Sequence, residues 1–436
     1  MVNNKPHLIF VGFHPSAVDA IDFVNYRISI IVHEYVADTL DASIRDRLTG
    51  LGVLKVPHNM NLEEYIDAMP EIEALAATLI EQHGHPKAFI ALYEHVTLPA
   101  ALLRKKFSVP GTSVATATLC RDKVKMKQCL QGTAIRYPQF KAVDSKTTLD
   151  EVKEFIHPLR EKLVLKPRAQ AASEGVFVFK NHAQLITHII QHGLADRYQL
   201  EEFISGRLCH FDGVVRNGAL IFFCASKYTT TCYDYVNHNV PMASITIDNA
   251  QLFNQAKYFT EIILRQVGLR DGTFHLEAFL VPQGEWVFLE VANRFGGAGV
   301  VPLMKKVYGV DLVKETILAD MLEPSEITQL ITTLDYNFSS AWLYIPIPLK
   351  QVCQVTAVFG IAQLPKVSIV ASDQVVVGQW LNQSVGPFPH AGRFFIKDET
   401  YNKVKALCKK IVDVYRVSVT AKDNIEKSLV NATTRS

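Results

Sequence analysis

The chain has 436 residues, so two to four cooperating units are expected in place of a single domain. Apolar residues make up 48% and charged residues 20% of the sequence, which is typical of a globular protein that buries a large core. The 45 Lys and Arg residues are balanced by 43 Asp and Glu residues, which excludes a general electrostatic attraction to nucleic acid or to an anionic membrane.

The cysteines and the apolar runs indicate in which cellular compartment the protein is expected. The seven cysteines are scattered and form no C-x-x-C pair, so we expect a reducing, cytoplasmic location without a zinc site or a disulfide framework. No stretch approaches 18 uninterrupted apolar residues, so no membrane span is expected. The first apolar run, residues 7–13, lacks a small-residue cleavage site and predicts a strand, not a signal peptide.

Strand-like and helix-like patterns alternate through residues 1–110. This alternation is typical of a parallel sheet covered by helices, in a Rossmann-like layer. No G-x-G-x-x-G follows any of the strands, so a dinucleotide site is not supported there. The predicted strands are residues 7–13, 27–33, 53–56 and 87–93, and the predicted helices are residues 16–26, 62–82 and 98–106.

A boundary at Val109-Pro110-Gly111 separates this layer from the rest of the chain. Strands dominate from residue 198 to residue 295, and residues 340–398 predict a β-rich terminal unit. We therefore expect four units, at residues 1–112, 113–195, 196–335 and 336–436. The other predicted elements are helices at 121–131, 183–192, 249–267 and 402–415, strands at 163–166 and 176–179, and a polar tail of about a dozen residues.

Two glutamates on one hairpin form the strongest chemical pattern in the sequence. Glu277 and Glu290 lie on successive predicted strands, and a turn centred on Gln283 and Gly284 sets them opposite each other. Such carboxylates have Cβ atoms about 5 Å apart and repel unless a cation or a shared proton compensates. Oxygen ligands on a rigid sheet suit Mg²⁺, so both are predicted metal ligands. The alternative is a pair of solvent-facing glutamates on a surface hairpin.

An arginine and a glycine run follow the second glutamate. Arg294 is well placed to hold a transferred phosphoryl group or a substrate carboxylate with two hydrogen bonds, so we predict it as the catalytic cation. Gly296 and Gly297 let the backbone approach a ligand, and their N–H groups can bind anions. A glycine run on its own is usually a turn, and its position beside the glutamate pair indicates substrate binding.

Two lysines form a second group. Lys166 ends a predicted buried strand, from which it can direct its charge at phosphates while its stem packs in the core, and Lys123 lies in the segment Arg121-Asp122-Lys123. The small residues of the loop 169–175, with Ser173 and Gly175, suit a segment that closes over a polyphosphate. On its own, each lysine is more often a solvated surface charge.

Two acidic segments complete the candidate set. Glu201-Glu202-Phe203-Ile204 is a candidate linker whose backbone edge pairs with adenine, although spacing alone does not distinguish it from a half-buried strand. Glu94 stands at the end of a predicted strand, where it could receive an ammonium group. The alternative for Glu94 is a surface or helix-capping acid.

The order of these motifs resembles the ATP-grasp superfamily, and closely its carboxylate–amine ligases, which include the L-amino acid ligases. The resemblance covers roughly residues 115–305. The matching segments are Asp122-Lys123, Leu165-Lys166-Pro167, Ser173-Glu174-Gly175, Glu201 to Gly206, His210-Phe211-Asp212-Gly213, His275-Leu276-Glu277 and Glu290 to Gly297.

The resemblance implies a fold and a set of roles. The fold is α/β and α+β: an ATP-grasp fold with a Rossmann-like N-terminal domain, a two-lobed nucleotide-binding core and a β-rich C-terminal unit. Lys123 and Lys166 would contact the phosphates of ATP, and residues 169–175 would cover them. Glu202 and Ile204 would meet adenine through backbone groups.

The remaining roles implied by the resemblance concern metal and substrates. Glu201 would lie near adenine or ribose, and His210 near the second substrate. Glu277 and Glu290 would hold two Mg²⁺ ions, for which Mn²⁺ is an alternative. Arg294 would stabilise the acyl phosphate and the tetrahedral intermediate.

The chain departs from the family pattern at two places. Arg207 and Leu208 stand where such ligases often carry an acidic residue that contacts ribose. Ala292 stands where many members have an asparagine, and Asn293 follows one position later, on the opposite face of a regular strand. Asn293 is therefore not included among the metal ligands.

The expected reaction joins a small-molecule carboxylate, such as an amino acid, to an amine. The carboxylate attacks the γ-phosphate of ATP, and the amine then attacks the acyl phosphate while water is excluded, with release of ADP and phosphate. A homodimer is expected, as is common in the family. The alternatives are an ATP-grasp carboxylase of the biotin or purine-precursor type, a kinase that stops at phosphorylation, and a non-catalytic ATP-binding regulatory protein.

Overall fold

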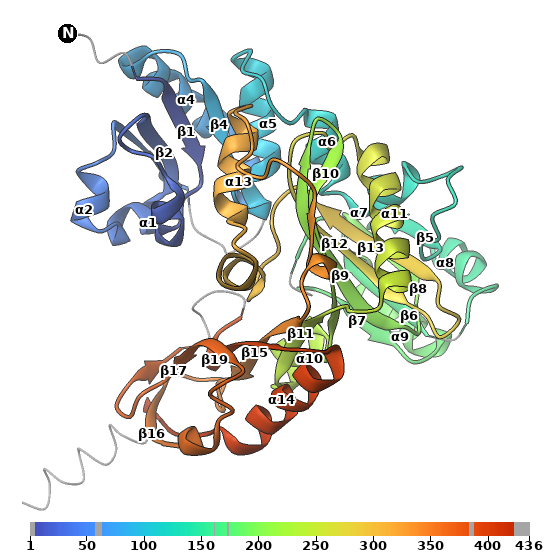
Figure 1. Cartoon of the computed structure of the whole chain (residues 1–436). Coiled ribbons are helices and arrows are strands. Elements are labelled where there is room, and N and C mark those ends of the chain that lie inside the picture. The colour runs from blue at the N-terminus through green and yellow to red at the C-terminus, as the bar shows by residue number, and fades with distance from the viewer. Residues whose placement is uncertain (1–4, 57–62, 161, 172–173, 383–387, 423–436) are drawn as a thin grey trace, which may run out of the picture.

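The computed structural model describes residues 5–56, 63–160, 162–171, 174–382 and 388–422 (Figure 1). Their strands form four sheets, which contain four, four, nine and three strands in order along the chain. Within the described residues, no helix combines the length and the apolar character that crossing a membrane requires.

The N-terminal sheet is parallel, as predicted, with the strand order β3-β2-β1-β4. Its strands are buried on both faces: Phe10 and Ile30 belong to one apolar cluster, and Ile9 and Ile31 to another. The strands are β1 (His7–Val11), β2 (Arg27–His33), β3 (Gly50–Leu54) and β4 (Ala88–Ile90). The helices around them are η1 (Pro15–Ala20), α1 (Glu34–Thr39), α2 (Ala42–Arg45), α3 (Glu64–Asp67), α4 (Met69–His83), η2 (Glu94–Val96) and α5 (Thr97–Lys106).

Three predictions in this region are corrected. The helix predicted at 16–26 is only the short 3-10 helix η1, because Asp22 accepts backbone hydrogen bonds in a turn after it. The helix predicted at 62–82 is divided between α3 and α4, since Pro70 has no N–H and its ring clashes with the carbonyl four residues before it; residue 62 lies outside the described residues. The strand predicted at 53–56 begins three residues earlier, at Gly50.

A small antiparallel sheet with the order β5-β8-β6-β7 follows. Apolar side chains of α8 and α9, such as Val152 and Leu185, share one core with Leu163, Leu165 and Leu200 of the strands. The elements are α6 (Val114–Leu119), α7 (Lys123–Gln128), β5 (Phe140–Val143), α8 (Leu149–Ile156), β6 (Leu163–Pro167), β7 (Phe177–Phe179), α9 (His182–His192) and β8 (Tyr198–Glu202). The helix predicted at 121–131 is therefore shorter, at α7.

The large sheet has the order β13-β12-β9-β10-β11-β15-β19-β17, and β14 pairs with β10. On β9, Cys209 and Phe211 pack with α11 in one core, so the alternating His210 and Asp212 lie on the opposite face. The elements are β9 (Arg207–Arg216), β10 (Ala219–Tyr228), α10 (Cys232–His238), β11 (Met242–Thr246), α11 (Ala250–Val267), β12 (Gly272–Leu280), β13 (Trp286–Ala292), α12 (Val300–Leu303), η3 (Met304–Tyr308), α13 (Leu312–Asp320), β14 (Ile331–Thr332) and η4 (Thr333–Asp335).

The C-terminal region is β-rich, as predicted, but it continues the large sheet. Strand β15 pairs with β11, so the boundary proposed at 335/336 falls within one continuous sheet. The elements are β15 (Ser339–Pro346), β16 (Cys353–Phe359), η5 (Ile361–Gln363), β17 (Ile369–Gln374), β18 (Trp380–Leu381), β19 (His390–Asp398), α14 (Tyr401–Val414) and β20 (Arg416–Ala421). The predicted polar tail, from residue 423, lies outside the described residues.

Candidate active site

The glutamate pair lies where the sequence predicted it. Glu277 on β12 is directly opposite Glu290 on β13. The register assumed at the turn is wrong, however, because Ala278 pairs with Phe288 and a bulge at Leu289 shifts the pairing by one residue. The bulge therefore brings the two glutamates opposite each other.

The two carboxylates and their surroundings fit a divalent cation. Oε2 of Glu290 lies 3.2 Å from Nζ of Lys123, and the Tyr228 hydroxyl donates a hydrogen bond to Glu277. Burial alone would raise the pKa of the Glu277 carboxyl, but its hydrogen bond with His275 holds that pKa below the ordinary value. Adjacent ionised oxygens on rigid strands are a donor set of the kind that Mg²⁺ takes, together with phosphate oxygens.

Both predicted lysines point toward acidic or carbonyl oxygens. Lys123 is the first residue of α7, after the N-cap Asp122, and its Nζ donates to the carbonyl of Gln170 at 2.6 Å. Lys166 is the second-last residue of β6, and its Nζ lies 2.7 Å from Oε2 of Glu201. Lys123 thus contacts both the loop predicted to cover phosphates and Glu290, one of the two predicted metal ligands.

Lys127 is a further cation that the sequence reasoning missed. It is fully buried, and its Nζ lies 2.5 Å from Oε1 of Glu201. Burial lowers the pKa of Lys127 to about 8, although Glu201 opposes the shift. Burial alone would raise the pKa of Glu201, but Lys127 and Lys166 lower it. The available signal was spacing, since Lys127 follows Lys123 by four residues on one helix face.

Two residues of the loop 169–175 were predicted to bind the nucleotide. Gly175 has a φ of +67°, and a Cβ there would lie 2.9 Å from Pro167 and Tyr198, so glycine is required. Ser173 lies outside the described residues.

The linker segment carries two glutamates with different environments. Glu202 accepts a hydrogen bond from the Gln139 N–H at 3.2 Å, and its own N–H donates to the Gln139 carbonyl. The Glu201 carboxylate is buried among lysines. Ile204 packs with Val287 in a small apolar cluster beside the linker.

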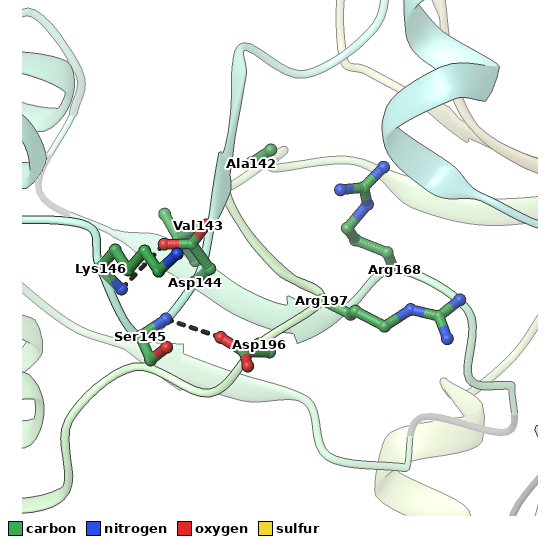
Figure 2. A pocket seen from close by; sticks show the side chains of 8 residues that line it. All are labelled: Ala142, Val143, Asp144, Ser145, Lys146, Arg168, Asp196 and Arg197. Carbon is green, nitrogen blue, oxygen red and sulfur yellow. Dashed lines mark hydrogen bonds between the residues drawn. The ribbon is translucent and has the colours of Figure 1, made fainter.

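Two cavities lie near the small antiparallel sheet. The first, of about 340 Å³, has Arg168 and Arg197 on one side and Asp144 and Asp196 on the other (Figure 2). The second, of about 260 Å³, also contains Arg197 and lies between α5 and α7. Neither of these two cavities is lined by the glutamate pair.

Arg294 and Glu94, predicted separately, lie together. Nε of Arg294 donates to Oε2 of Glu94 at 2.7 Å, and Nη1 of Arg121 lies 3.5 Å from Oε1 of Glu94. Burial would raise the pKa of Glu94, but Arg294 and Arg121 hold it at about 2. Glu94 is therefore neither a helix cap nor an isolated surface acid. Arg121, which was missed, directly precedes the Asp122-Lys123 motif.

The two predicted glycines differ in their surroundings. A Cβ at Gly296 would lie 2.4 Å from Oδ1 of Asp212, whereas a Cβ at Gly297 would meet only a ring carbon of Phe388, at 3.9 Å. Gly296 is therefore required by close packing, and Gly297 faces open space.

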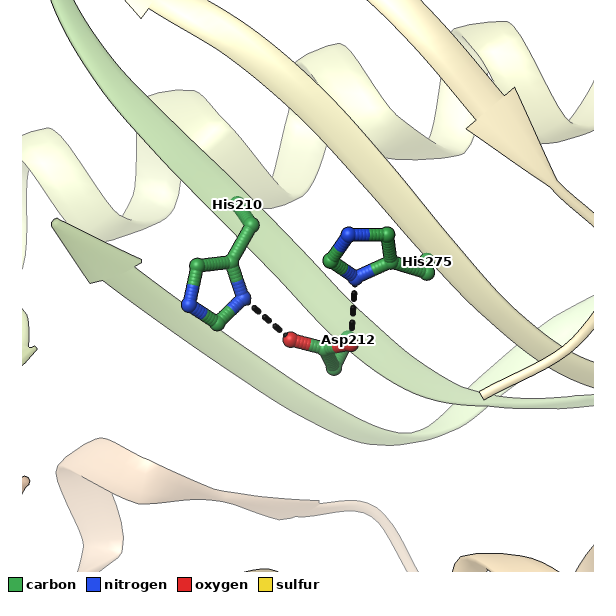
Figure 3. Close-up of side chains that lie close together, drawn as sticks. All are labelled: His210, Asp212 and His275. Atoms are coloured by element: carbon green, nitrogen blue, oxygen red, sulfur yellow. Dashed lines mark hydrogen bonds and ion pairs between the residues drawn. The ribbon is translucent and has the colours of Figure 1, made fainter. Parts of the chain in front are cut away.

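His210 is part of a buried network (Figure 3). Its Nδ1 lies 2.5 Å from Oδ2 of Asp212, and its Nε2 lies 2.5 Å from the hydroxyl of Ser244. Nδ1 of His275 lies 2.8 Å from Oδ1 of the same aspartate. The side chain predicted to lie near the second substrate thus has both ring nitrogens engaged by protein groups.

The charges of this network compensate one another. Burial alone would raise the pKa of Asp212, but His275 and His210 hold it well below its ordinary value. Burial would lower the pKa of His275, yet Asp212 raises it to about 9. His210, Asp212 and His275 each offer one potential metal-ligand atom, and these atoms lie within 4.8 Å of one another, a spacing that could hold a metal ion. Because each imidazole is already paired with the aspartate, the arrangement fits a hydrogen-bonded network better than a second metal site.

Comparisons with known proteins bear on the domain family and the fold. Residues 159–301 match the model of the ATP-grasp domain family. An L-arginine-specific L-amino acid ligase of Bacillus subtilis is 20% identical over 262 residues, which cover 58% of this chain and 62% of that protein. The chain thus matches less than two thirds of this relative's length.

Solved structures show the fold over almost the whole chain. An L-amino acid ligase from Bacillus licheniformis has a TM-score of 0.70 at 13% identity, covering 95% of this chain and 98% of that one. A biotin carboxylase from Campylobacter jejuni in an ATP-type complex has a TM-score of 0.66 at 14% identity, covering 95% and 92%. The predicted ATP-grasp fold is thereby confirmed.

Proposed function

We propose that this chain, which has the ATP-grasp fold and carries an ATP-grasp domain, is an ATP-dependent carboxylate–amine ligase that forms an amide or peptide bond. The observation that carries the proposal is that Glu277 lies opposite Glu290, whose Oε2 is 3.2 Å from Nζ of Lys123. Arg294 follows Glu290 by four residues. This arrangement supplies acidic groups for a cation and cationic groups for phosphates within one hairpin and its neighbours.

The nucleotide would lie between the small antiparallel sheet and the large sheet. Lys123 and Lys166 would neutralise its phosphates, and the loop 169–175 would exclude water from them. The backbone of Glu202 and Ile204 would meet adenine, beside the apolar cluster at Ile204. ATP is the co-substrate that the domain implies.

Glu277 and Glu290 would hold two Mg²⁺ ions, and Mn²⁺ is the alternative metal. Bound there, the metal would supply charge stabilisation to the phosphoryl group during transfer. The protein's own contribution is geometric, because the strand pairing fixes both carboxylates while Lys123 remains within reach of Glu290.

The pair of Arg294 and Glu94 supports an amino acid as a substrate. An arginine beside a glutamate is the electrostatic complement of a molecule that carries both a carboxylate and an ammonium group. The carboxylate or acyl phosphate would bind Arg294, and the ammonium would bind Glu94, with Arg121 keeping Glu94 ionised. Gly296 and Gly297 would offer backbone N–H groups to the same substrate. The named L-amino acid ligases similar to this chain agree with this substrate class.

The second candidate function is carboxylation, favoured by the fold likeness to biotin carboxylase. A carboxylase would activate bicarbonate, which has no ammonium group, and would make no use of Glu94. We therefore place the ligase first.

The decisive experiment traps the acyl phosphate. Hydroxylamine intercepts an acyl phosphate as a hydroxamate, so a screen of amino acids and other carboxylates with Mg-ATP and hydroxylamine should give hydroxamate even when the natural amine is unknown. Release of ADP with bicarbonate alone would instead support the carboxylase. ATP binding with no turnover on any carboxylate would support a regulatory binder.

Substitution of Arg294 extends the test to the reacting centre. Arg294→Ala should bind ATP yet lose hydroxamate formation, because the charge that stabilises the transferred group is removed. Arg265→Ala, an exposed arginine on α11, is the matched control and should keep wild-type rates. Normal hydroxamate formation by Arg294→Ala would contradict the assignment of the reacting centre.

A further inference from the structure

The face of the large sheet that carries Glu277 holds two rows of polar side chains. Across β9 and β12, Glu277 pairs with His210 and His275 pairs with Asp212. His275 occupies the central place, because its Nδ1 lies 2.8 Å from Oδ1 of Asp212 and its Nε2 lies 3.7 Å from Oε1 of Glu277. Asp212 is fully buried and is also held by His210.

The turn after β13 lies directly on this pair. A Cβ at Gly296 would lie 2.4 Å from Oδ1 of Asp212 and 2.8 Å from Nδ1 of His275, distances that no ordinary Cβ contact reaches. These two atoms are hydrogen-bonded to each other, so a methyl group at Gly296 must displace the bonded pair or the turn itself. Arg294 stands two residues before Gly296, and its Nη1 donates to the Phe295 carbonyl at 2.7 Å.

We propose that His275 is a positioning residue: with Asp212 it forms a floor that fixes the metal-ligating Glu277 and the Arg294–Gly296 turn relative to each other. The proposal rests on the function proposed above. Both groups must act on one phosphoryl group, and a displacement of about 1 Å at such a site can lower the rate about 100-fold. One imidazole that contacts both is a direct way to keep their separation constant.

At the far end of the same turn, Gly299 lies against Trp342, whose fluorescence can report how the turn packs. A Cβ at Gly299 would lie 2.4 Å from Cβ of Trp342, whose side chain is 1% exposed. The chain has three tryptophans, and the other two are Trp286 and Trp380. Replacing those two by Phe leaves Trp342 emission as a measure of how the turn packs, without substrate or metal.

The first experiment adds one methyl group at two neighbouring positions in this background. Gly296→Ala should shift the Trp342 emission and lower the melting temperature, because its Cβ meets the floor. Gly297→Ala is the matched control and should leave both unchanged, since its Cβ meets only Phe388 at 3.9 Å. Identical behaviour of the two variants would overturn the proposal.

A double variant tests whether the floor itself is responsible. Asp212→Ser removes the oxygen nearest to the new methyl group, so Gly296→Ala should shift the emission less in the Asp212→Ser background than in the parent. Simple addition of the two single effects would overturn the proposal. These measurements need no catalysis, so they remain informative if wild-type protein fails to turn over ATP, an outcome that would contradict the proposed function alone.

The second experiment separates the two contacts of His275. Asn retains an amide nitrogen near the place of Nδ1, and Gln retains one near Nε2. His275→Asn should keep the Trp342 emission but weaken Mn²⁺ binding in the presence of ADP, measured by electron paramagnetic resonance, by about tenfold or more. His275→Gln should bind Mn²⁺ more tightly than His275→Asn but shift the emission. Wild-type Mn²⁺ affinity in both variants would overturn the positioning of Glu277 by His275.

Discussion

Nε of Arg294 donates a 2.7 Å hydrogen bond to Oε2 of Glu94, although 200 residues separate them in the chain. The contact joins the turn after β13 to the residue that begins η2, next to the N-terminal sheet. Burial would lower the pKa of Arg294, but Glu94 raises it, so both partners are ionised. An amino acid substrate would replace this internal ion pair with two intermolecular ones.

Substitution of Glu94 tests that exchange. Glu94→Gln keeps the shape of the side chain and removes its charge, so the KM for an amino acid substrate should rise about tenfold or more, as for loss of a hydrogen bond to a charged group. Glu81→Gln, an exposed glutamate on α4, is the control and should leave the KM unchanged. An unchanged KM in Glu94→Gln would remove Glu94 from the substrate site.

The low pKa of Glu94 predicts a pH dependence of stability, which the same variant tests. The pKa of Glu94 is about 2 in the folded protein and ordinarily 4.5, so the ion pair stabilises the fold fully above pH 4.5 and progressively less as the pH falls toward 2. Chemical unfolding at a series of pH values should show Glu94→Gln less stable than wild type at pH 7, with the difference shrinking below pH 4.5. A constant difference would contradict the low pKa.

Nucleotide binding should stabilise the protein through linkage. If Lys123, Lys166 and the glutamate pair form the proposed site for Mg-triphosphate, ATP with Mg²⁺ should raise the melting temperature, by the equivalent of about 2.7 kcal/mol at a hundred times Kd. Differential scanning calorimetry measures the shift, with ATP and EDTA as the control. Isothermal titration without heat at millimolar Mg-ATP would contradict the nucleotide site.

Substitution of Glu290 separates chemistry from folding. In the proposed site, Glu290→Gln removes the charge of a metal ligand at the reacting phosphoryl group, so ATP-dependent phosphate release should fall on the order of 100-fold or more while the fold persists. Glu399→Gln is the control, since its exposed carboxylate pairs with Lys403 of α14. Wild-type turnover in Glu290→Gln would refute the metal assignment.

Substitution of Lys127 tests the buried charge group. Lys127→Met leaves Glu201 with Lys166 as its remaining ion-pair partner among the lysines, so the free energy of unfolding should fall by about 1–3 kcal/mol. The KM for ATP should also rise, because Lys166 is then held more tightly by Glu201. Lys125→Met, exposed on the same helix, should show neither change. Equal stability of the two variants, measured by urea unfolding, would contradict the role of Lys127.

The prediction for the glutamate pair was right for a reason that was partly wrong. Strand alternation and hairpin symmetry placed Glu277 opposite Glu290, but the turn has a different register and the bulge at Leu289 restores the pairing. A bulge leaves no clear trace in residue types, because Leu289 is an ordinary strand residue. The sequence therefore predicted the pair but not the local geometry that makes it.

By itself, the sequence determined the features that depend on near neighbours in the chain. Alternating patterns identified the parallel N-terminal strands, the strand β6 that carries Lys166, and the hairpin of Glu277 and Glu290, because period and turn position fix which face each side chain takes. The order of motifs then identified the ATP-grasp fold.

Only the tertiary structure decided which distant side chains meet. The pair of Asp212 and His275 requires β9 to lie beside β12, and the pair of Arg294 and Glu94 requires the N-terminal sheet to lie against the core. Periodicity assigns a face to a side chain but does not name the neighbouring strand, since many strand orders bury the same apolar surface. Those orders differ in which charges they bring together, and the buried charges in this chain are compensated across segments that are far apart in sequence.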